Sequence, residues 1–212
     1  MKFSKLPLAS KLVETLPSGI DGLFNPWRDR CPHDAAGNGP DEKLQRLALH
    51  LDCAPQFVLA GEAPGYQGCR YSGIAFTSER LLGEGAIPRI PAPAGRLSNR
   101  RLPFSEPSAT IVWKTLYRLG IAERTILWNA MQLHPYRKDN LWSNRTPTPD
   151  EIRLGEPALR MLIAEFPAAR IVAVGKKSEG LLREMGIPVA GSVRHPANGG
   201  ATEFANGLKD LM

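Results

Sequence analysis

Short apolar runs alternate with amphipathic segments along most of the chain. The apolar runs predict buried strands at residues 56–60, 125–128, 170–174 and 187–190. Apolar positions at helical spacing predict helices at residues 8–16, 41–51, 78–82, 108–120, 149–166, 176–185 and 201–211. This alternation is typical of an α/β fold, with a mostly parallel four-stranded sheet and helices on both faces.

Polar side chains follow three of these strands. Glu62 comes after the first strand, Asn129 directly after the second, and His195 a few residues after the last. Because open α/β sheets build their binding sites at the carboxyl ends of their strands, we expect these three side chains to meet at one edge of the sheet.

A segment rich in proline and arginine interrupts the pattern at residues 83–107. No helical or strand period survives there, so we expect an irregular insertion within a single domain that spans residues 1–212. The segment carries four arginines with no acidic residue between them: Arg89, Arg96, Arg100 and Arg101. The net charge is +6 and the pI about 9.4, a balance that suits a polyanionic partner.

Composition excludes several classes of protein. No apolar stretch approaches the roughly 20 residues that a membrane-spanning helix needs, and the opening residues 1–7 lack an apolar signal core. The three cysteines, Cys31, Cys53 and Cys69, form no Cys-x-x-Cys pair, which favours reduced thiols in a cytoplasmic protein. The histidines at positions 33, 50, 134 and 195 have no metal-ligand spacing, so no metal site is expected.

Four short segments carry the remaining chemistry, and their order is informative. They are Gly61-Glu62-Ala63-Pro64-Gly65, Gly73-Ile74-Ala75-Phe76, Asn129 and His195-Pro196. In order and approximate spacing, from residue 58 to residue 200, they resemble the uracil-DNA glycosylase superfamily. The first segment is similar to the water-activating motif of the thermophilic and bacterial iron–sulfur branch, and the last is similar to the His-Pro-Ser motif.

The resemblance implies a three-layer α/β/α fold and a monofunctional DNA-repair glycosylase. Such an enzyme flips uracil out of DNA and hydrolyses its N-glycosidic bond without metal or organic cofactor. Glu62 and His195 are the implied catalytic residues. Phe76 and Asn129, together with Gly61 and Ala63, are the implied base-binding residues.

Two aromatic residues compete for the role of stacking on the base. The segment Gly68-Cys69-Arg70-Tyr71-Ser72-Gly73 also resembles the iron–sulfur branch and would place Tyr71 on the base. The spacing from Glu62, 14 residues to Phe76 against 9 to Tyr71, favours Phe76. The expected phosphate contacts are Arg70, Arg96, Arg100, Arg101 and Arg194.

The chain also departs from the pattern. It has three cysteines where the iron–sulfur branch uses four, so no cluster is expected. Gly65 stands where the best-known branch has a tyrosine that excludes thymine. Discrimination against the thymine methyl group would then come from Tyr66 or Tyr71, or be looser. Residues 197–200, Ala-Asn-Gly-Gly, lack the bulky apolar wedge that many relatives insert into the duplex.

These departures keep two other hypotheses open. One is a glycosylase for another deaminated or damaged base, and the other is a non-catalytic nucleic-acid-binding member of the same fold. In each case we expect DNA as the partner, no membrane, a monomer, and a cytoplasmic location that becomes nucleoid-associated when the protein acts on DNA.

Overall fold

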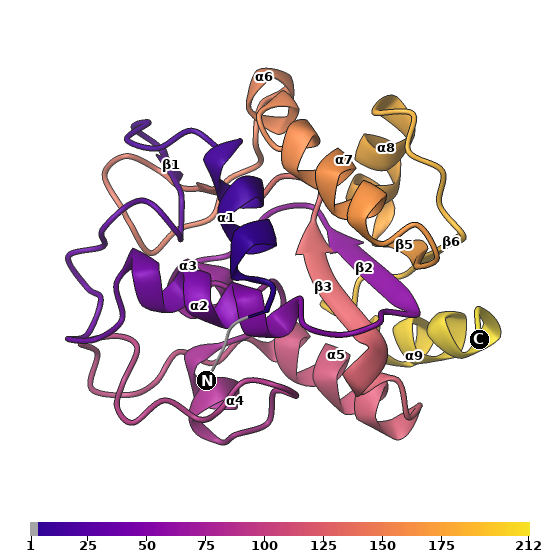
Figure 1. Ribbon diagram of the computed structural model, residues 1–212, viewed down its shortest axis with the longest axis horizontal. Helices are drawn as coiled ribbons and strands as arrows, with labels where there is room; N and C mark the ends of the chain where they lie inside the picture. The colour runs from indigo at the N-terminus through magenta and orange to yellow at the C-terminus, as the bar shows by residue number, and fades with distance from the viewer. Residues whose placement is uncertain (1–3) are drawn as a thin grey trace.

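Four parallel strands form the centre of the computed structural model, which describes residues 4–212 (Figure 1). The strands are β2 (Phe57–Gly61), β3 (Thr125–Asn129), β5 (Arg170–Val174) and β6 (Gly191–Val193). They lie in the order β3-β2-β5-β6, and every adjacent pair is parallel. The predicted α/β class and parallel four-stranded sheet are confirmed. Residues 1–3, part of the opening segment considered for a signal, lie outside the described residues.

Helices cover both faces of the sheet. In Figure 1, α7 and α8 lie above the sheet and α5 and α9 below it. The helices are α1 (Leu6–Glu14), α2 (Pro40–His50), α3 (Cys69–Ser72), α4 (Glu79–Gly83), α5 (Pro107–Arg118), α6 (Pro149–Arg153), α7 (Glu156–Glu165), α8 (Lys176–Glu184) and α9 (Ala201–Asp210). No helix among residues 4–212 is long and apolar enough to cross a membrane.

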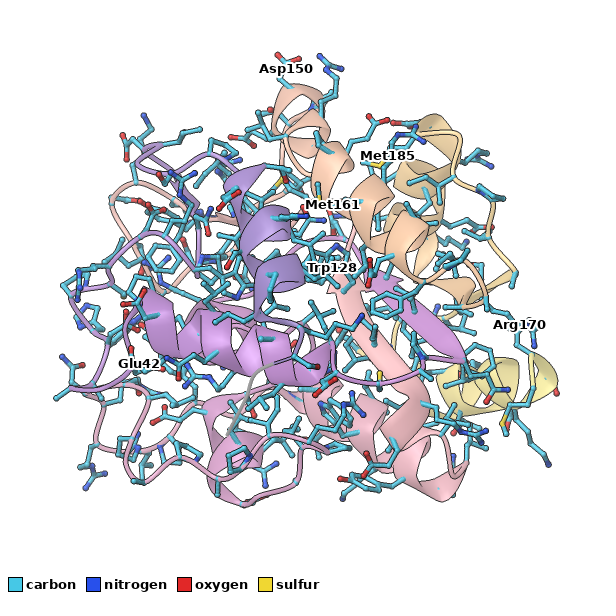
Figure 2. All side chains as sticks on the ribbon, viewed as in Figure 1. Glu42, Trp128, Asp150, Met161, Arg170 and Met185 are labelled. Carbon is cyan, nitrogen blue, oxygen red and sulfur yellow. The ribbon has the colours of Figure 1, made fainter. Side chains whose placement is uncertain are left out.

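The core lies between the sheet and these helices. The strand residues are buried on both faces, as expected for a parallel sheet covered on both sides. Figure 2 shows Trp128 of β3 at the centre of the molecule, where it is 2% exposed and stacks on Trp27. Asp150, by contrast, projects from the periphery.

The last strand differs from the prediction. It runs over Gly191–Val193 rather than residues 187–190. Ile187 instead closes the end of α8, where its N–H donates to the Leu182 carbonyl at 2.9 Å. Pro188 has no N–H to donate to a ladder, and pairing with β5 starts only where the Ala190 N–H reaches the Ile171 carbonyl at 2.7 Å. The apolar run at residues 187–190 therefore forms the segment between α8 and β6 rather than a strand.

The predicted helix at residues 149–166 is two helices. α6 ends at Arg153, and α7 starts at Glu156 after Gly155. A Cβ on Gly155 would lie 2.8 Å from the Ala130 carbonyl oxygen, so the chain needs a glycine where it crosses the end of β3. Pro157 lies in the first turn of the new helix, where its missing N–H costs nothing.

Two helices also start one residue earlier than the predicted ranges at residues 41–51 and 108–120. α2 begins at Pro40 with Gly39 at the N-cap, and Glu42 accepts the Gly39 N–H at 2.8 Å. α5 begins at Pro107, and its N-cap is Glu106. In both cases the proline at the first helical position sets the start.

Glu79 anchors the segment at residues 83–107, which is irregular over most of its length. One carboxylate oxygen accepts hydrogen bonds from Arg96 Nε at 2.6 Å and from the Leu97 and Ser98 N–H groups. The other accepts from Ser98 Oγ at 2.6 Å and from the Phe104 N–H at 3.0 Å. Burial alone would raise the pKa of Glu79, but these donors lower it overall. One buried carboxylate thus fixes both arms of the loop.

A second, two-stranded sheet fixes the loop that precedes α2. β1 (Leu23–Phe24) pairs antiparallel with β4 (His134–Pro135). The sequence pattern predicted only loop at both positions, because two-residue strands carry no periodicity.

A buried histidine covers the free edge of β3. His50 Nε2, at the end of α2, accepts the Leu127 N–H at 2.8 Å, which satisfies a donor that no neighbouring strand reaches. Burial, reinforced by the positive charge of Arg89, lowers the pKa of His50 to about 3. Burial, with the nearby Arg70, likewise lowers the pKa of His134 to about 3. Both rings are therefore neutral at ordinary pH.

Acidification should destabilise the fold through these two rings. Below pH 6.5 the unfolded chain binds protons that the native state accepts only near pH 3, so the free energy of unfolding falls by about 1.4 kcal/mol per pH unit for each ring. Urea denaturation between pH 7.5 and 4.5 measures the slope. The variant His50→Gln should be less stable at pH 7 and lose about 1.4 kcal/mol less per pH unit. A slope equal to that of the unmodified protein would contradict the assignment.

Candidate active site

A cavity of about 900 Å³ opens at the carboxyl edge of the sheet. Because the strands are parallel, β2, β3, β5 and β6 all end at this edge. The side chains of Glu62, Phe76, Asn129 and His195 line the cavity. The four residues singled out from the sequence are therefore brought together, and Ala63 lines the same cavity.

Gly61 sets how closely these side chains approach the sheet. It pairs with Asn129 across β2 and β3. A Cβ on Gly61 would lie 2.7 Å from Asn129 Oδ1 and 2.7 Å from Phe76 Cζ, closer than any real contact allows. Gly61 therefore lies beneath the cavity, where the absence of a side chain makes room for the amide and the ring.

Phe76 is held in an uncommon backbone conformation. Its φ is +49°, in the left-handed region that residues other than glycine seldom adopt. The ring is 8% exposed and lies 6.0 Å, centroid to centroid, from the His195 ring. A conformation of this kind costs about 1–3 kcal/mol and persists only where the surrounding structure imposes it. The ring of Phe76 is therefore kept at the cavity wall despite a local energetic cost.

Glu62 leaves the sheet just beyond β2. The Met131 N–H donates to its backbone carbonyl at 3.0 Å, which continues the pairing of the two strands past their ends. Its side chain is 28% exposed, and Lys177 Nζ at the start of α8 lies 3.2 Å from Glu62 Oε1. Lys177 also donates to Thr146 Oγ1 at 3.3 Å, so the lysine ties the acid to a neighbouring loop.

His195 is partly buried, and a backbone contact orients it. The Ala197 N–H donates to His195 Nδ1 at 3.2 Å. In the neutral ring the proton therefore lies on Nε2, which is left as a donor. Burial lowers the pKa of His195, and the nearby Glu62 carboxylate only partly offsets this. Gly175, with φ +89°, leaves room for the ring, because a Cβ there would lie 3.0 Å from His195 Cβ.

Three further polar residues on the cavity wall were missed by the sequence analysis. Lys177 and Asn144 carried no motif, because they reach the site only through the tertiary fold. Glu106 lies at the N-cap of α5, and Ser108 Oγ donates to Glu106 Oε1 at 2.7 Å. Burial raises the pKa of Glu106, and the Ser108 hydroxyl only partly offsets the shift. The only sequence signal for Glu106 was that an acidic residue lies just before the predicted helix at residues 108–120.

Tyr71 cannot stack on a ligand in this cavity. Its side chain is 0% exposed and stacks on Phe104 at 4.7 Å between centroids. The Trp142 Nε1–H donates to its hydroxyl at 2.9 Å. The alternative role considered for Tyr71 is therefore wrong, because α3 turns this ring into the core. Tyr66 is not part of the cavity lining either, and packs edge-on against Phe104.

Arg70 was expected to contact phosphate, and this expectation is also wrong. Arg70 is 1% exposed, and its NH1 lies 3.0 Å from His134 Nδ1. Its guanidinium lies 3.9 Å from the Phe24 ring. The side chain joins α3 to the small sheet β1–β4 inside the protein.

The other four arginines differ in how available they are. Arg96 forms an ion pair with Glu79, although its side chain remains 40% exposed. The Arg100 guanidinium lies 4.3 Å from the Phe104 ring, and Arg101 is exposed. Arg194 is exposed and lines the cavity.

Metal-ligating residues do not gather in the part of the chain that the structure describes. No group of three or more His, Cys, Asp or Glu side chains among residues 4–212 is placed to hold a metal ion. Cys31, Cys53 and Cys69 are free thiols, and burial raises the pKa of Cys69, which lines the cavity.

Comparison with known proteins places the fold and the family. The family model described as the uracil DNA glycosylase superfamily matches residues 91–205, more than half of the chain. This stretch contains Asn129 and His195, whereas Glu62 and Phe76 precede it. The search of curated proteins found no match.

Among solved structures, wild-type SMUG2 from Pedobacter heparinus is similar to this chain. The TM-score is 0.63 at 14% sequence identity, and the alignment covers 96% of this chain and 97% of that one. At this identity the likeness concerns the fold, which is shared over nearly the whole length.

Adding a methyl group at Gly61 should disrupt the cavity wall. In Gly61→Ala the new Cβ would displace Phe76, Asn129 or both, and overpacking of this kind costs about 1–3 kcal/mol. Gly180→Ala on α8 is the matched control, because a Cβ there meets nothing within 4 Å. Crystal structures and urea denaturation of both variants check this. An unmoved Phe76 and Asn129 in Gly61→Ala would contradict it.

Proposed function

Because the chain belongs to the uracil-DNA glycosylase superfamily, we propose that it is a DNA glycosylase that hydrolyses the N-glycosidic bond of uracil in DNA. The observation that carries the proposal is the meeting of an acid, an amide, an aromatic ring and an imidazole in one cavity. Such a pocket can receive a base only after the nucleotide leaves the helix stack.

Glu62 would serve the sugar side of the reaction. As the bond between N1 and C1′ breaks, positive charge develops on the sugar and the bonding electrons pass to the base. A carboxylate beside the sugar stabilises this charge and accepts a proton from the water that attacks C1′. The contact of Glu62 with Lys177 at 3.2 Å supports this role, because it holds the acid at the mouth of the cavity. Water as the nucleophile makes the enzyme monofunctional.

His195 would serve the departing base. The tautomer set by the Ala197 N–H leaves Nε2–H free to donate to uracil O2, where negative charge builds. The lowered pKa of His195 favours the neutral ring, which can donate this bond without carrying a charge into the cavity. Burial thus suits the ring to this task.

Asn129 and Phe76 would recognise the base. The amide can accept from N3–H and donate to O4 of uracil, whereas cytosine presents the opposite pattern and would leave buried groups unpaired. Phe76 offers a flat face for stacking, worth about 1–3 kcal/mol per base. The close approach of both side chains over Gly61 supports their acting on one planar ligand.

A second candidate is a glycosylase for another deaminated or damaged base. It is favoured by position 65, where a glycine replaces a bulky wall and the Asn144 side chain lies opposite. A Cβ on Gly65 would lie 3.5 Å from Asn144 Nδ2, so a polar amide borders this side of the cavity. A purine could be admitted here and could pair with that amide.

The remaining parts of the proposal concern the setting. DNA is the proposed partner, met by Arg194 at the cavity and by Arg100 and Arg101 on the loop. We propose that the protein acts as a monomer in the cytoplasm, at the nucleoid, without a cofactor.

Incubation with a uracil-containing oligonucleotide, followed by alkaline strand cleavage, tests the activity. Glu62→Gln should lower the single-turnover rate by about 100-fold or more, because it removes the base that activates water. His195→Ala should lower it by about 100- to 1000-fold, because it removes a donor to the departing base.

Glu184→Gln is the matched control for the acid, since Glu184 is exposed at the end of α8 and should leave the rate unchanged. All variants should melt within a few degrees of the unmodified protein. Absence of cleavage by the folded, unmodified protein on every base tested would leave only the non-catalytic member of the fold.

The choice of base is tested separately. Oligonucleotides with uracil, thymine, hypoxanthine and xanthine should be compared under single-turnover conditions. The proposal expects the fastest release from uracil, and Gly65→Tyr should leave uracil release within a few-fold while abolishing any release of thymine or purines. Faster release of a purine than of uracil would favour the second candidate.

A further inference from the structure

An exposed tryptophan lies close to the cavity but is not part of its wall. Trp142 is 38% exposed, and its indole is fixed from within: Nε1 donates to the Tyr71 hydroxyl at 2.9 Å, and Tyr71 is fully buried. The ring packs edge-on against Phe104 at 5.9 Å, and the His33 ring lies 4.7 Å away at 46°. Trp142 is therefore a rigid aromatic surface open to solvent rather than a loosely attached side chain.

An arginine extends this aromatic surface. The Arg100 guanidinium lies 4.3 Å from the Phe104 ring and 5.6 Å from the Trp142 ring. Arg100 takes part in none of the ion pairs among residues 4–212, so its charge is not neutralised by a carboxylate. Arg101 beside it is exposed as well. Phe104 is only 2% exposed and supports this surface from the interior. We call the surface formed by Trp142, His33 and Arg100 over Phe104 the aromatic patch.

The aromatic patch is continuous with the rim of the cavity. Tyr66 packs edge-on against Phe104 at 5.9 Å and lies between Gly65 and Gln67, which both line the cavity. Asn144, two residues beyond Trp142, also lines the cavity and accepts the Tyr66 N–H at 3.1 Å. A strand that placed one nucleotide in the cavity would therefore carry its neighbours toward the patch.

We propose that the aromatic patch binds an unpaired base of the DNA strand that flanks the nucleotide in the cavity, with Arg100 and Arg101 contacting its phosphates. Flat aromatic faces next to uncompensated guanidinium groups match the two surfaces of a single strand, its base faces and its phosphates. A base inside a duplex offers neither face, because both are stacked. The position beside the extruded nucleotide rests on the proposed function, but the binding of a single strand does not.

The test measures binding to DNA that contains no uracil. A fluorescein-labelled 12-mer of thymidine and a 12-base-pair duplex are titrated with the full chain at several salt concentrations, and anisotropy gives the dissociation constants. Trp142→Leu should weaken single-strand binding by about 10-fold or more and change duplex binding by less than 2-fold. Arg100→Ala should weaken single-strand binding and reduce its salt slope by about one, whereas Arg100→Lys should keep the slope and still bind more weakly.

Matched controls lie at the C-terminal end of α5 and make no contact with the patch residues. Tyr117→Leu removes an aromatic that is 50% exposed, and Arg118→Ala removes an exposed arginine, and neither should change single-strand binding. Melting temperatures exclude unfolding, and His33→Ala provides a second patch variant if Trp142→Leu is unstable.

The proposal is overturned by equal losses for single strand and duplex, by no loss in the patch variants, or by an equal effect of Tyr117→Leu. Such a result would leave cleavage of uracil untouched. Patch-dependent binding without any cleavage would instead support this inference while removing the proposed function.

Discussion

The pairing of Gly61 with Asn129 across two parallel strands is the constraint on which the site depends. The register places the ends of β2 and β3 side by side, and the bonds from the Ala130 N–H to the Gly61 carbonyl and from the Met131 N–H to the Glu62 carbonyl continue the pairing past both strands. The acid therefore leaves the sheet at a fixed point beside the amide. Only a glycine at position 61 lets the ring of Phe76 lie against the backbone at this place.

Much of this arrangement could be predicted from the sequence, for physical reasons that also mark the limits. The apolar runs before Glu62 and Asn129 end where the strands end, so the apolar pattern predicted the positions of both residues. The last strand was predicted at the wrong residues because an apolar run can form either a strand or the segment that leaves a helix. Pro188 lacks the N–H that strand pairing needs, but this excludes a strand only when the neighbouring contacts are known. The burial of Arg70 and Tyr71 could not be predicted from the sequence, because the four-residue helix α3 is too short to show a helical apolar pattern. Lys177 and Glu106 reach the cavity only through tertiary packing.

Burial shifts two titratable groups of the cavity toward their neutral forms. It lowers the pKa of His195 and raises the pKa of Glu106, and both shifts favour the neutral form. Charged groups line the same cavity, among them the Glu62–Lys177 pair and the exposed Arg194. A neutral planar ligand in the cavity would thus lie near two groups whose neutral forms are favoured by burial.

The anchoring of residues 83–107 by Glu79 affects the thermodynamics of ligand association. Loops without helix or strand usually lose conformational entropy when a ligand immobilises them, at about 0.5–1.5 kcal/mol per flexible side chain. Here a single buried carboxylate holds Arg96, Ser98 and the Phe104 backbone before any ligand arrives. That entropy has already been lost on folding, so the arm that carries Arg100 and Arg101 is preorganised before any ligand binds.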